Sequence, residues 1–342
     1  MRRPRDRGAV GAIVAVLFGT GVALGMAALV VDIGLIYVER KQLQTGADAA
    51  AVEVARVCAA SAVACGAPGT NATAAAYARE NVVDGEAMAA VCGRGGGLAA
   101  CAGVSACARP APETGVYAEV RTSILRADGS TLLPPVFAQA VVDDYDGAAV
   151  TACARVTWGP PRAARTLGLT VSACDWADLT RRGRTFPSAE RTVRGYDDTD
   201  PAACGRGGVG SRGAGGFRWV AGADASCRTP VSTTTTFRVT ARTQRPAGCR
   251  DVLETLTPGQ AVAVPIFSAV TDAGDGGFAY TVLGVGAFVV TGWRLPGSRS
   301  PRTPAGCGGG DCVSGYFTRA PVPGGGTVGG PDLGAQITAL IG

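Results

Sequence analysis

One apolar run near the start of the chain limits the fold more than any other feature. Four arginines precede this run, which extends without a charged residue from Gly8 to Val31. At about 1.5 Å per residue the run forms a helix of roughly 36 Å, longer than the ~30 Å hydrocarbon core of a bilayer. We therefore predict a cytoplasmic tail at residues 1–7 and a transmembrane helix at 8–31, because flanking arginines favour the cytoplasmic side.

The helical pattern continues past the apolar run to about Val57. A cleaved signal peptide is the alternative to an anchor, and Gly25-Met26-Ala27 could serve as its cleavage site. A signal peptide ends at its cleavage site and is followed by unrelated sequence, whereas here the period runs straight through. The pattern favours a retained anchor that continues as a stalk helix over residues 32–60.

An apolar stripe with four-three spacing follows one face of this helix. Its members are Val22, Met26, Leu29, Ile33, Ile36, Leu43, Ala47, Ala50, Val54 and Val57, and Arg40 occupies the one slot that breaks it. Such a stripe is typical of a seam with partner helices, and equally of a helix whose outer half packs on its own domain. Gly21 and Gly25 form a GxxxG pair that permits close helix approach in lipid, so a homo-oligomer through the first helix is one expectation.

Charge and composition limit the partners. The net charge of +5 is scattered outside the N-terminus, and no basic stripe interleaved with aromatic residues occurs. The sequence therefore predicts no nucleic-acid partner.

Twelve cysteines and no histidine indicate disulfides in an oxidising compartment. No CxxC pair and no imidazole is available for zinc, so we predict no metal site. Three close pairs are candidates for local bridges: Cys58 with Cys65, Cys101 with Cys107, and Cys307 with Cys312.

Residues 61–115 are predicted to form a helix–loop segment rich in cysteine and glycine. Thr70 or Asn71 could cap a short helix that runs to about Val83. From Cys92 to Pro112 the composition of Gly, Ala, Cys and Pro indicates a disulfide-stapled loop.

Residues 116–320 are predicted to form the extracytoplasmic α+β domain. Strand patterns occur at residues 116–125, 148–158, 233–242, 261–270, 278–295 and 313–318. Residues 181–216 are rich in arginine and glycine and are interpreted as an irregular excursion. Residues 321–342 are expected to form a flexible tail with a possible edge strand at Ala335–Ile341.

Catalytic motifs are missing. Without histidine no Ser/His/Asp or Cys/His arrangement can form. Gly208, Gly210 and Gly213 spell GxGxxG, but no strand pattern precedes them and no helix pattern follows. Five carboxylates could in principle pair for hydrolysis: Asp143, Asp144, Asp197, Asp198 and Asp200. We predict no enzyme and no cofactor.

The segment VDIGLIYVERKQLQTGADAAAVEVARVCA at residues 31–59 resembles the TadE/TadG-like family of tight-adherence (Flp) pilus-assembly proteins. The residues that carry the resemblance are Asp32, Gly34, Tyr37, Arg40, Leu43, Gln44 and the alanine-rich run around Asp48. Later pieces such as YAREN at 77–81, ACARVTWGPP at 152–161 and LTVSACDW at 169–176 are similar to the high-GC bacterial branch.

The resemblance implies a membrane-anchored, extracytoplasmic component of a pilus or secretion apparatus that acts by assembly. Its partners would be other pilus-assembly membrane proteins or pilins. Some relatives carry a DxSxS metal site and pilin-type relatives carry a glutamate inside the apolar helix; neither occurs here. Asp32 has two interpretations: it pairs with a partner's arginine, or it lies in the wet interface with little effect.

The expected fold is α+β. A single N-terminal transmembrane helix continues as a stalk helix and packs on an antiparallel β-rich domain stabilised by disulfides. The expected function is a structural, minor-pilin-like subunit at the cell membrane. The alternatives are a surface-binding module that uses residues 181–216 and a cell-envelope hydrolase that uses paired carboxylates.

Overall fold

The computed structural model describes residues 6–103, 107–140, 144–195, 215–240, 245–249, 251–257, 259–272, 277–301, 306–307 and 310–342. Three of the carboxylates expected as hydrolase candidates, Asp197, Asp198 and Asp200, lie outside this range, as do Asp143 and the GxGxxG glycines.

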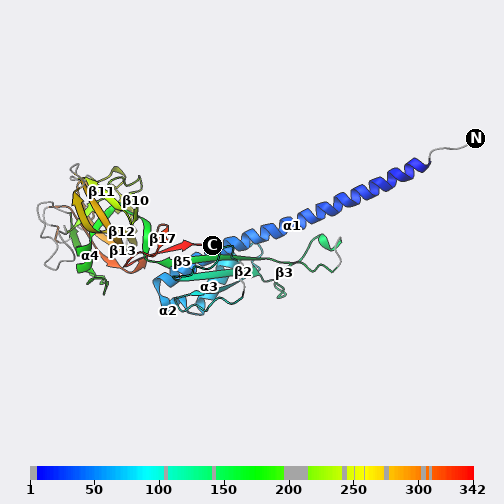
Figure 1. Cartoon of the computed structure of the whole chain (residues 1–342), viewed down its shortest axis with the longest axis horizontal. Helices are drawn as coiled ribbons and strands as arrows, with labels where there is room; N and C mark the ends of the chain where they lie inside the picture. Colours follow the sequence, from blue (N-terminus) through cyan, green and yellow to red (C-terminus); the bar gives the residue numbers. More distant parts are fainter. Residues whose placement is uncertain are drawn as a thin grey trace, which may run out of the picture.

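The first helix, α1 (Asp6–Ala60), runs for 55 residues without interruption. Figure 1 shows its N-terminal half projecting from the rest of the molecule, whereas its C-terminal half lies against the domain. The predicted long helix is confirmed. At about 1.5 Å per residue it spans roughly 80 Å, more than twice the core of a bilayer.

The C-terminal half of α1 belongs to a proximal unit. This unit also holds α2 (Ala62–Cys65), α3 (Gly69–Glu80) and a five-stranded sheet in the order β1-β2-β5-β19-β16. The strands are β1 (Ala87–Arg94), β2 (Tyr117–Ile124), β5 (Thr151–Gly159), β16 (Ala320–Pro321) and β19 (Ala335–Leu340). All neighbours pair antiparallel except β16 and β19.

The core of the proximal unit consists mainly of small side chains. Ala47, Ala50 and Ala51 of α1 are buried against Ala118 of β2 and Ala154 of β5. Ala152, Ala154 and Val156 of β5, together with Val150 just before it, are buried on the side of the sheet that faces α1. The outer half of the α1 stripe therefore packs on the protein's own domain.

The distal unit contains two further sheets. A nine-stranded sheet has the path β8-β15-β13-β12-β7-β9, with β11, β14 and β18 also pairing with β13, and a three-stranded sheet has the order β10-β6-β17. The long central pair is β12 (Ala261–Asp272) and β13 (Gly277–Leu295). The shorter strands are β6 (Pro161–Leu167), β7 (Leu169–Ser172), β8 (Arg191–Arg194), β9 (Phe217–Trp219), β10 (Arg228–Ser232), β11 (Thr236–Thr240), β14 (Ser298–Arg299), β15 (Cys312–Thr318), β17 (Gly326–Val328) and β18 (Asp332–Leu333).

Large side chains fill the core of the distal unit. Phe217, Phe288, Trp293 and Phe317 are buried together, and the rings of Phe288 and Phe317 lie 4.9 Å apart. A short helix, α4 (Ala173–Leu179), covers part of this sheet through Trp176. Two 3-10 turns, η2 (Ala247–Cys249) and η3 (Val252–Thr255), complete the unit.

A finger, defined as the described part of residues 132–149, leaves the sheet between β2 and β5. It contains β3 (Leu132–Leu133), the 3-10 turn η1 (Ala138–Ala140) and β4 (Ala148–Ala149). Figure 1 shows this excursion running beside α1 toward the projecting half of the helix.

The disulfides differ in part from the expected pairs. Cys58 bonds to Cys65 and Cys307 to Cys312, as proposed from their spacing, whereas the pairing of Cys101 with Cys107 is wrong. The remaining described bridges join Cys92 to Cys101, Cys107 to Cys153 and Cys227 to Cys249.

A glycine turn after β1 explains why Cys101 bonds to Cys92 and not to Cys107. Gly95, Gly96 and Gly97 have φ values of 89°, 64° and 81°, which glycine adopts without strain. The chain therefore folds back along β1, and the N–H of Gly93 donates to the carbonyl of Ala99 at 2.8 Å. This return brings Cys101 opposite Cys92 and leaves Cys107 beside β5.

Three other expectations change. The helix–loop segment 61–115 also contains β1, a strand of small residues that the glycine- and cysteine-rich composition concealed. The expected tail 321–342 contributes β17, β18 and β19, and β19 is an interior strand because β16 lies outside it. The domain 116–320, for which strand patterns were predicted, also contains the helix α4.

Candidate functional site

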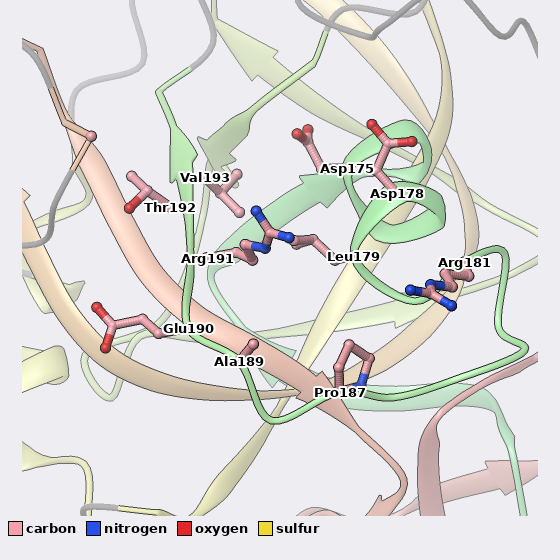
Figure 2. Close-up of a pocket in the computed structure, with 11 residues that line it drawn as sticks. Asp175, Asp178, Leu179, Arg181, Pro187, Ala189, Glu190, Arg191, Thr192 and Val193 are labelled. Atoms are coloured by element: carbon pink, nitrogen blue, oxygen red, sulfur yellow. The ribbon is translucent and has the colours of Figure 1, made fainter.

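An open cleft in the distal unit collects charged side chains from α4 and β8 (Figure 2). Its volume is about 830 Å³, and its lining includes Asp175, Asp178, Arg181, Glu190 and Arg191. Part of the expected excursion at 181–216 therefore lines a cleft. Of the five expected carboxylates, the structure describes only Asp144. This residue is exposed on the finger and is not one of the residues that line the cleft.

Asp175 is the most buried acid of the cleft and is held by the start of α4. The hydroxyl of Ser172 accepts a hydrogen bond from the N–H of Asp175 at 3.0 Å, and the carboxylate of Asp175 accepts from Ser172 Oγ and from the N–H of Gly216. Burial raises the pKa of Asp175, although the hydrogen bonds from Ser172 and Gly216 oppose this effect, and the nearby charge of Asp178 adds to it. The Ser172 hydroxyl caps α4, and the Asp175 carboxylate joins this cap to Gly216, which accounts for the position of Asp175.

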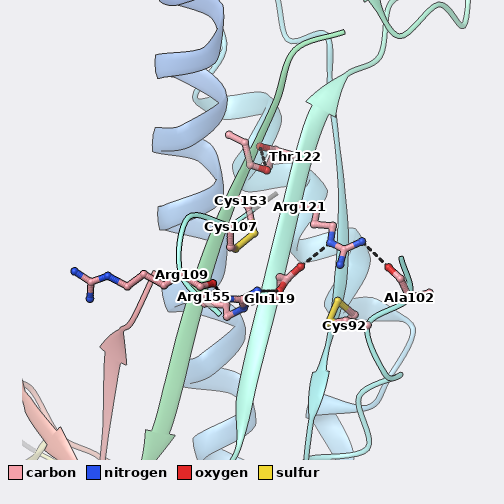
Figure 3. A network of polar contacts seen from close by, with 11 residues as sticks. Cys92, Ala102, Cys107, Arg109, Glu119, Arg121, Thr122, Cys153 and Arg155 are labelled. Carbon is pink, nitrogen blue, oxygen red and sulfur yellow. Dashed lines mark hydrogen bonds and ion pairs between the residues drawn. A yellow bond between two sulfur atoms is a disulfide. The ribbon is translucent and has the colours of Figure 1, made fainter. Parts of the chain in front are cut away.

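The face of the proximal sheet that points away from α1 carries a second polar site (Figure 3). Glu119 of β2 is 1% exposed and forms ion pairs with Arg155 of β5 and Arg121 of β2, each at 2.6 Å. Arg155 also donates to the carbonyl of Arg109, and Arg121 donates to that of Ala102 at 2.8 Å. Through these two arginines, one buried carboxylate links β2 and β5 to the connection between β1 and β2.

Cysteine sulfurs surround Glu119 but offer no metal site. Cys92 and Cys101 lie on one side of its carboxylate, and Cys107 and Cys153 lie on the other. All four are bonded in disulfides, so they cannot act as thiolate ligands.

Polar groups join α1 to the sheet on its other face. The hydroxyl of Thr122 donates to the carbonyl of Leu43 at 3.0 Å. The amide of Gln44 donates to Asp48 Oδ1 at 2.9 Å and to the carbonyl of Cys153 at 3.1 Å. Leu43 and Gln44, which carry part of the family resemblance, therefore join the helix to its own sheet, and Asp48 holds the Gln44 amide in place.

Asp32 lies where the apolar run ends, and neither expected interpretation describes it. It is 6% exposed, and its carboxylate accepts hydrogen bonds from the N–H groups of Val136 at 2.9 Å, Phe137 at 3.1 Å and Ala138 at 2.5 Å. The partner is thus residues 136–138, here called the tip of the finger, more than a hundred residues away in sequence. No short-range pattern could have indicated this contact.

The stretch of α1 just beyond Asp32 is exposed. Tyr37 and Arg40 line a shallow hollow of about 290 Å³ with Lys41 and Gln44, and the ammonium of Lys41 lies 5.6 Å from the centre of the Tyr37 ring. Tyr37 is 62% exposed. These residues are available to a partner or to lipid headgroups.

The projecting half of α1 has no cover within the described residues. An 18-residue window of this helix has a mean hydropathy of 2.4 and is 0% buried, so the helix is long and apolar enough to cross a membrane. At Gly21 and Gly25 an added Cβ would meet no described atom within 4 Å. The glycine pair therefore faces open space.

Residues 11–57 match a protein-family model described as putative Flp pilus-assembly TadE/G-like. The match covers the apolar half of α1 and the half that packs on the sheet, and it confirms the resemblance for this segment. No curated protein matches the chain. No solved structure matches it either.

Proposed function

We propose that this chain is a membrane-anchored structural subunit, minor-pilin-like, of a tight-adherence pilus or a related secretion apparatus. The observation that carries the proposal is the division of α1. Residues matched to a pilus-assembly family include both a bare apolar half and a half that is built into the proximal sheet. An anchor and a displayed domain are thereby joined in one helix.

The bare half needs a nonpolar environment. Val16, Leu17, Phe18 and Leu24 are each more than 60% exposed. A continuous apolar surface of this kind is rare on soluble monomers and has the length of a bilayer core. Lipid, with or without partner helices, would cover it.

Orientation follows from charge and from the disulfides. The N-terminal arginines favour the cytoplasm under the positive-inside rule. Five described disulfides in the two units favour an oxidising compartment for the remainder of the chain. Both arguments give a single-pass protein with an extracytoplasmic domain.

Assembly would use the membrane half of α1. Gly21 and Gly25 allow a second helix to approach closely, and Val22, Met26 and Leu29 extend the apolar stripe that faces a partner. The partners would be pilins, other pilus-assembly membrane proteins or a second copy of this chain.

Photo-crosslinking in cells that carry the pilus genes tests this proposal. A photoreactive residue at Val22 or Met26 should give crosslinks to membrane proteins of the apparatus or to a second copy. Leu24 and Val31 point to the other side of the helix at 100° per residue and serve as matched controls. Recovery of the protein in the soluble fraction after alkaline extraction would contradict the anchor.

The same experiment separates the alternatives. Crosslinks at the stripe that disappear when the pilus genes are deleted support an assembly subunit. Absence of crosslinks on α1, together with a ligand captured at the cleft of Asp175 and Arg191, would favour the surface-binding module instead.

A further inference from the structure

The tip of the finger is an apolar surface at the level where α1 leaves the domain. Val136 is 57% exposed and Phe137 is 47% exposed. Outside α1, they are the only large exposed apolar residues that are neighbours in the sequence, among the residues that the structure describes. From Thr131 to Ala140 the chain carries no charged residue.

Asp32 fixes the height of this tip along α1. The hydrogen bonds from Val136, Phe137 and Ala138 hold the tip beside the first residue after the apolar run. If residues 8–31 occupy the hydrocarbon core, the tip lies at the boundary between hydrocarbon and headgroups.

The hydrogen bonds at the tip suit a poorly hydrated environment. Unpaired backbone N–H groups are costly away from water, and three consecutive N–H groups would otherwise remain unpaired at the tip. The carboxylate of Asp32 satisfies all three. The apolar side chains of Val136 and Phe137 can therefore move out of water without burying unpaired backbone N–H groups.

Neighbouring residues on α1 match the chemistry of a headgroup layer. Tyr37 lies about 7.5 Å beyond Asp32 along the helix axis, and Lys41 lies about 14 Å beyond it. Tyrosine is enriched at membrane interfaces, and long cationic side chains reach headgroup phosphates. Both side chains are exposed, and the Lys41 ammonium lies over the Tyr37 ring.

We propose that the finger is a second membrane contact, in which Val136 and Phe137 insert into the interfacial layer of the bilayer that α1 crosses, with Asp32 as the positioning residue. This inference rests on the proposed membrane anchor. Two contacts, one through the helix and one through the finger, would restrict the tilt of the domain above the lipid, whereas a helix alone leaves it free to tilt.

Depth-dependent quenching tests the proposal. The full-length chain would be reconstituted in vesicles of phosphatidylcholine and phosphatidylglycerol, without reduction of its disulfides. An environment-sensitive fluorophore is attached at Val136→Cys or Phe137→Cys. Leu29→Cys reports the inserted helix, and Asp128→Cys, at an exposed turn between β2 and the finger, reports water.

Lipids with a nitroxide just below the headgroup should lower the fluorescence at positions 136 and 137 to about half or less, since the interfacial layer is only several Å thick. The label at Asp128→Cys should be unaffected. Quenching at Leu29→Cys with none at 136 and 137 would overturn the finger contact and leave the anchor standing. Absence of quenching at all positions would contradict the anchor itself.

The role of Asp32 has its own test. In Asp32→Ala the label at Phe137→Cys should lose most of its quenching while the label at Leu29→Cys keeps it, because the tip is released but the helix remains inserted. Asp32→Asn retains one acceptor oxygen and should give an intermediate value. Equal quenching at position 137 in all three proteins would refute the positioning role.

A protein partner is the competing occupant. If the label at Phe137→Cys is exposed to water in lipid vesicles but shielded in native membranes that contain the pilus apparatus, a partner helix covers the tip and the lipid contact is wrong.

Discussion

The proximal and distal units bury different kinds of side chain. Alanines dominate the contact between α1 and the five-stranded sheet, whereas phenylalanine, tryptophan and branched aliphatic residues fill the distal core. A helix that lies across a sheet approaches closely only where side chains are short, and small residues on both surfaces permit this. The distal sheet has little helical cover beyond α4, so its own large side chains must supply the buried volume.

The two units also differ in how they use charge. The proximal unit buries Glu119 with Arg155, both at most 2% exposed, whereas the ion pair of Arg319 with Asp332 near the distal sheet is about half exposed. A buried pair contributes little net stability when intact, but removal of one partner leaves an uncompensated charge. We therefore expect the proximal unit to be more sensitive than the distal unit to substitution of a single charged residue.

The largest expected effect is at Glu119. Glu119→Gln should destabilise the proximal unit by about 3–5 kcal/mol, because Arg155 loses its buried counter-charge. Denaturant unfolding in detergent would be followed through Trp158, the proximal tryptophan, in a variant whose other three tryptophans are phenylalanine.

The exposed pair provides the control for this change. Arg319→Met should cost less than about 1 kcal/mol, as measured through the distal tryptophans. Equal losses for the two substitutions would remove the distinction between the units.

Disulfides give the next effect. Removal of the proximal bridge by Cys107→Ala with Cys153→Ala should cost about 2–4 kcal/mol. Its loop spans 46 residues and that of the distal bridge of Cys227 with Cys249 spans 22. The distal double variant should therefore lose about 0.6 kcal/mol less, given one doubling of loop length. The same denaturant unfolding measurement tests this order. A larger loss of stability for the distal variant, which has the shorter loop, would contradict it.

Close packing at α1 predicts a smaller effect. Gly46 is buried, and a Cβ there would lie 3.1 Å from Ala78 Cα of α3. Gly46→Leu should destabilise the proximal unit by about 1–3 kcal/mol through overpacking, despite the better helix propensity of leucine. Gly34→Leu on the exposed part of α1 is the matched control, since no described atom lies within 4 Å of its Cβ position. A gain in stability at Gly46→Leu would show that α3 can move away.

The smallest effect concerns pH and the distal unit. Burial raises the pKa of Asp175, so the folded chain holds this proton to a higher pH than the unfolded chain does. Protonated Asp175 therefore stabilises the folded chain at pH values below the usual pKa of a carboxyl group. This stabilisation is lost as pH rises from the usual carboxyl pKa to the raised pKa of Asp175. Asp175→Asn should flatten this part of the stability–pH profile of the distal unit, and an unchanged slope would show that the group does not titrate as proposed.

The sequence predicted well the features that repeat along the chain. The α1 helix combines a long uncharged apolar run with a stripe of four-three spacing, and β5 and β13 have the alternating or apolar patterns of buried strands. The α4 helix was missed although Ser172 and Asp175 form a capping pattern three residues apart that could have indicated it.

Contacts between distant residues escaped prediction. Asp32 and the finger tip are more than a hundred residues apart, and the pairing of Cys107 with Cys153 depends on the path of a loop across a sheet. The strand β1 combines alanine with glycine and cysteine, so its local composition is typical of a loop and only its pairing with β2 makes it a strand. Such features follow from tertiary packing, which a short window of sequence does not contain.

The interior position of β19 has a consequence for biogenesis. Strand β5 can pair with β2 as soon as both are synthesised. The other edge of β5 pairs with β19, residues 335–340, which is synthesised about 175 residues later. Until then a row of unpaired backbone groups on β5 stays open to any extended polypeptide nearby. We expect newly exported chains to need protection from cross-pairing during this interval.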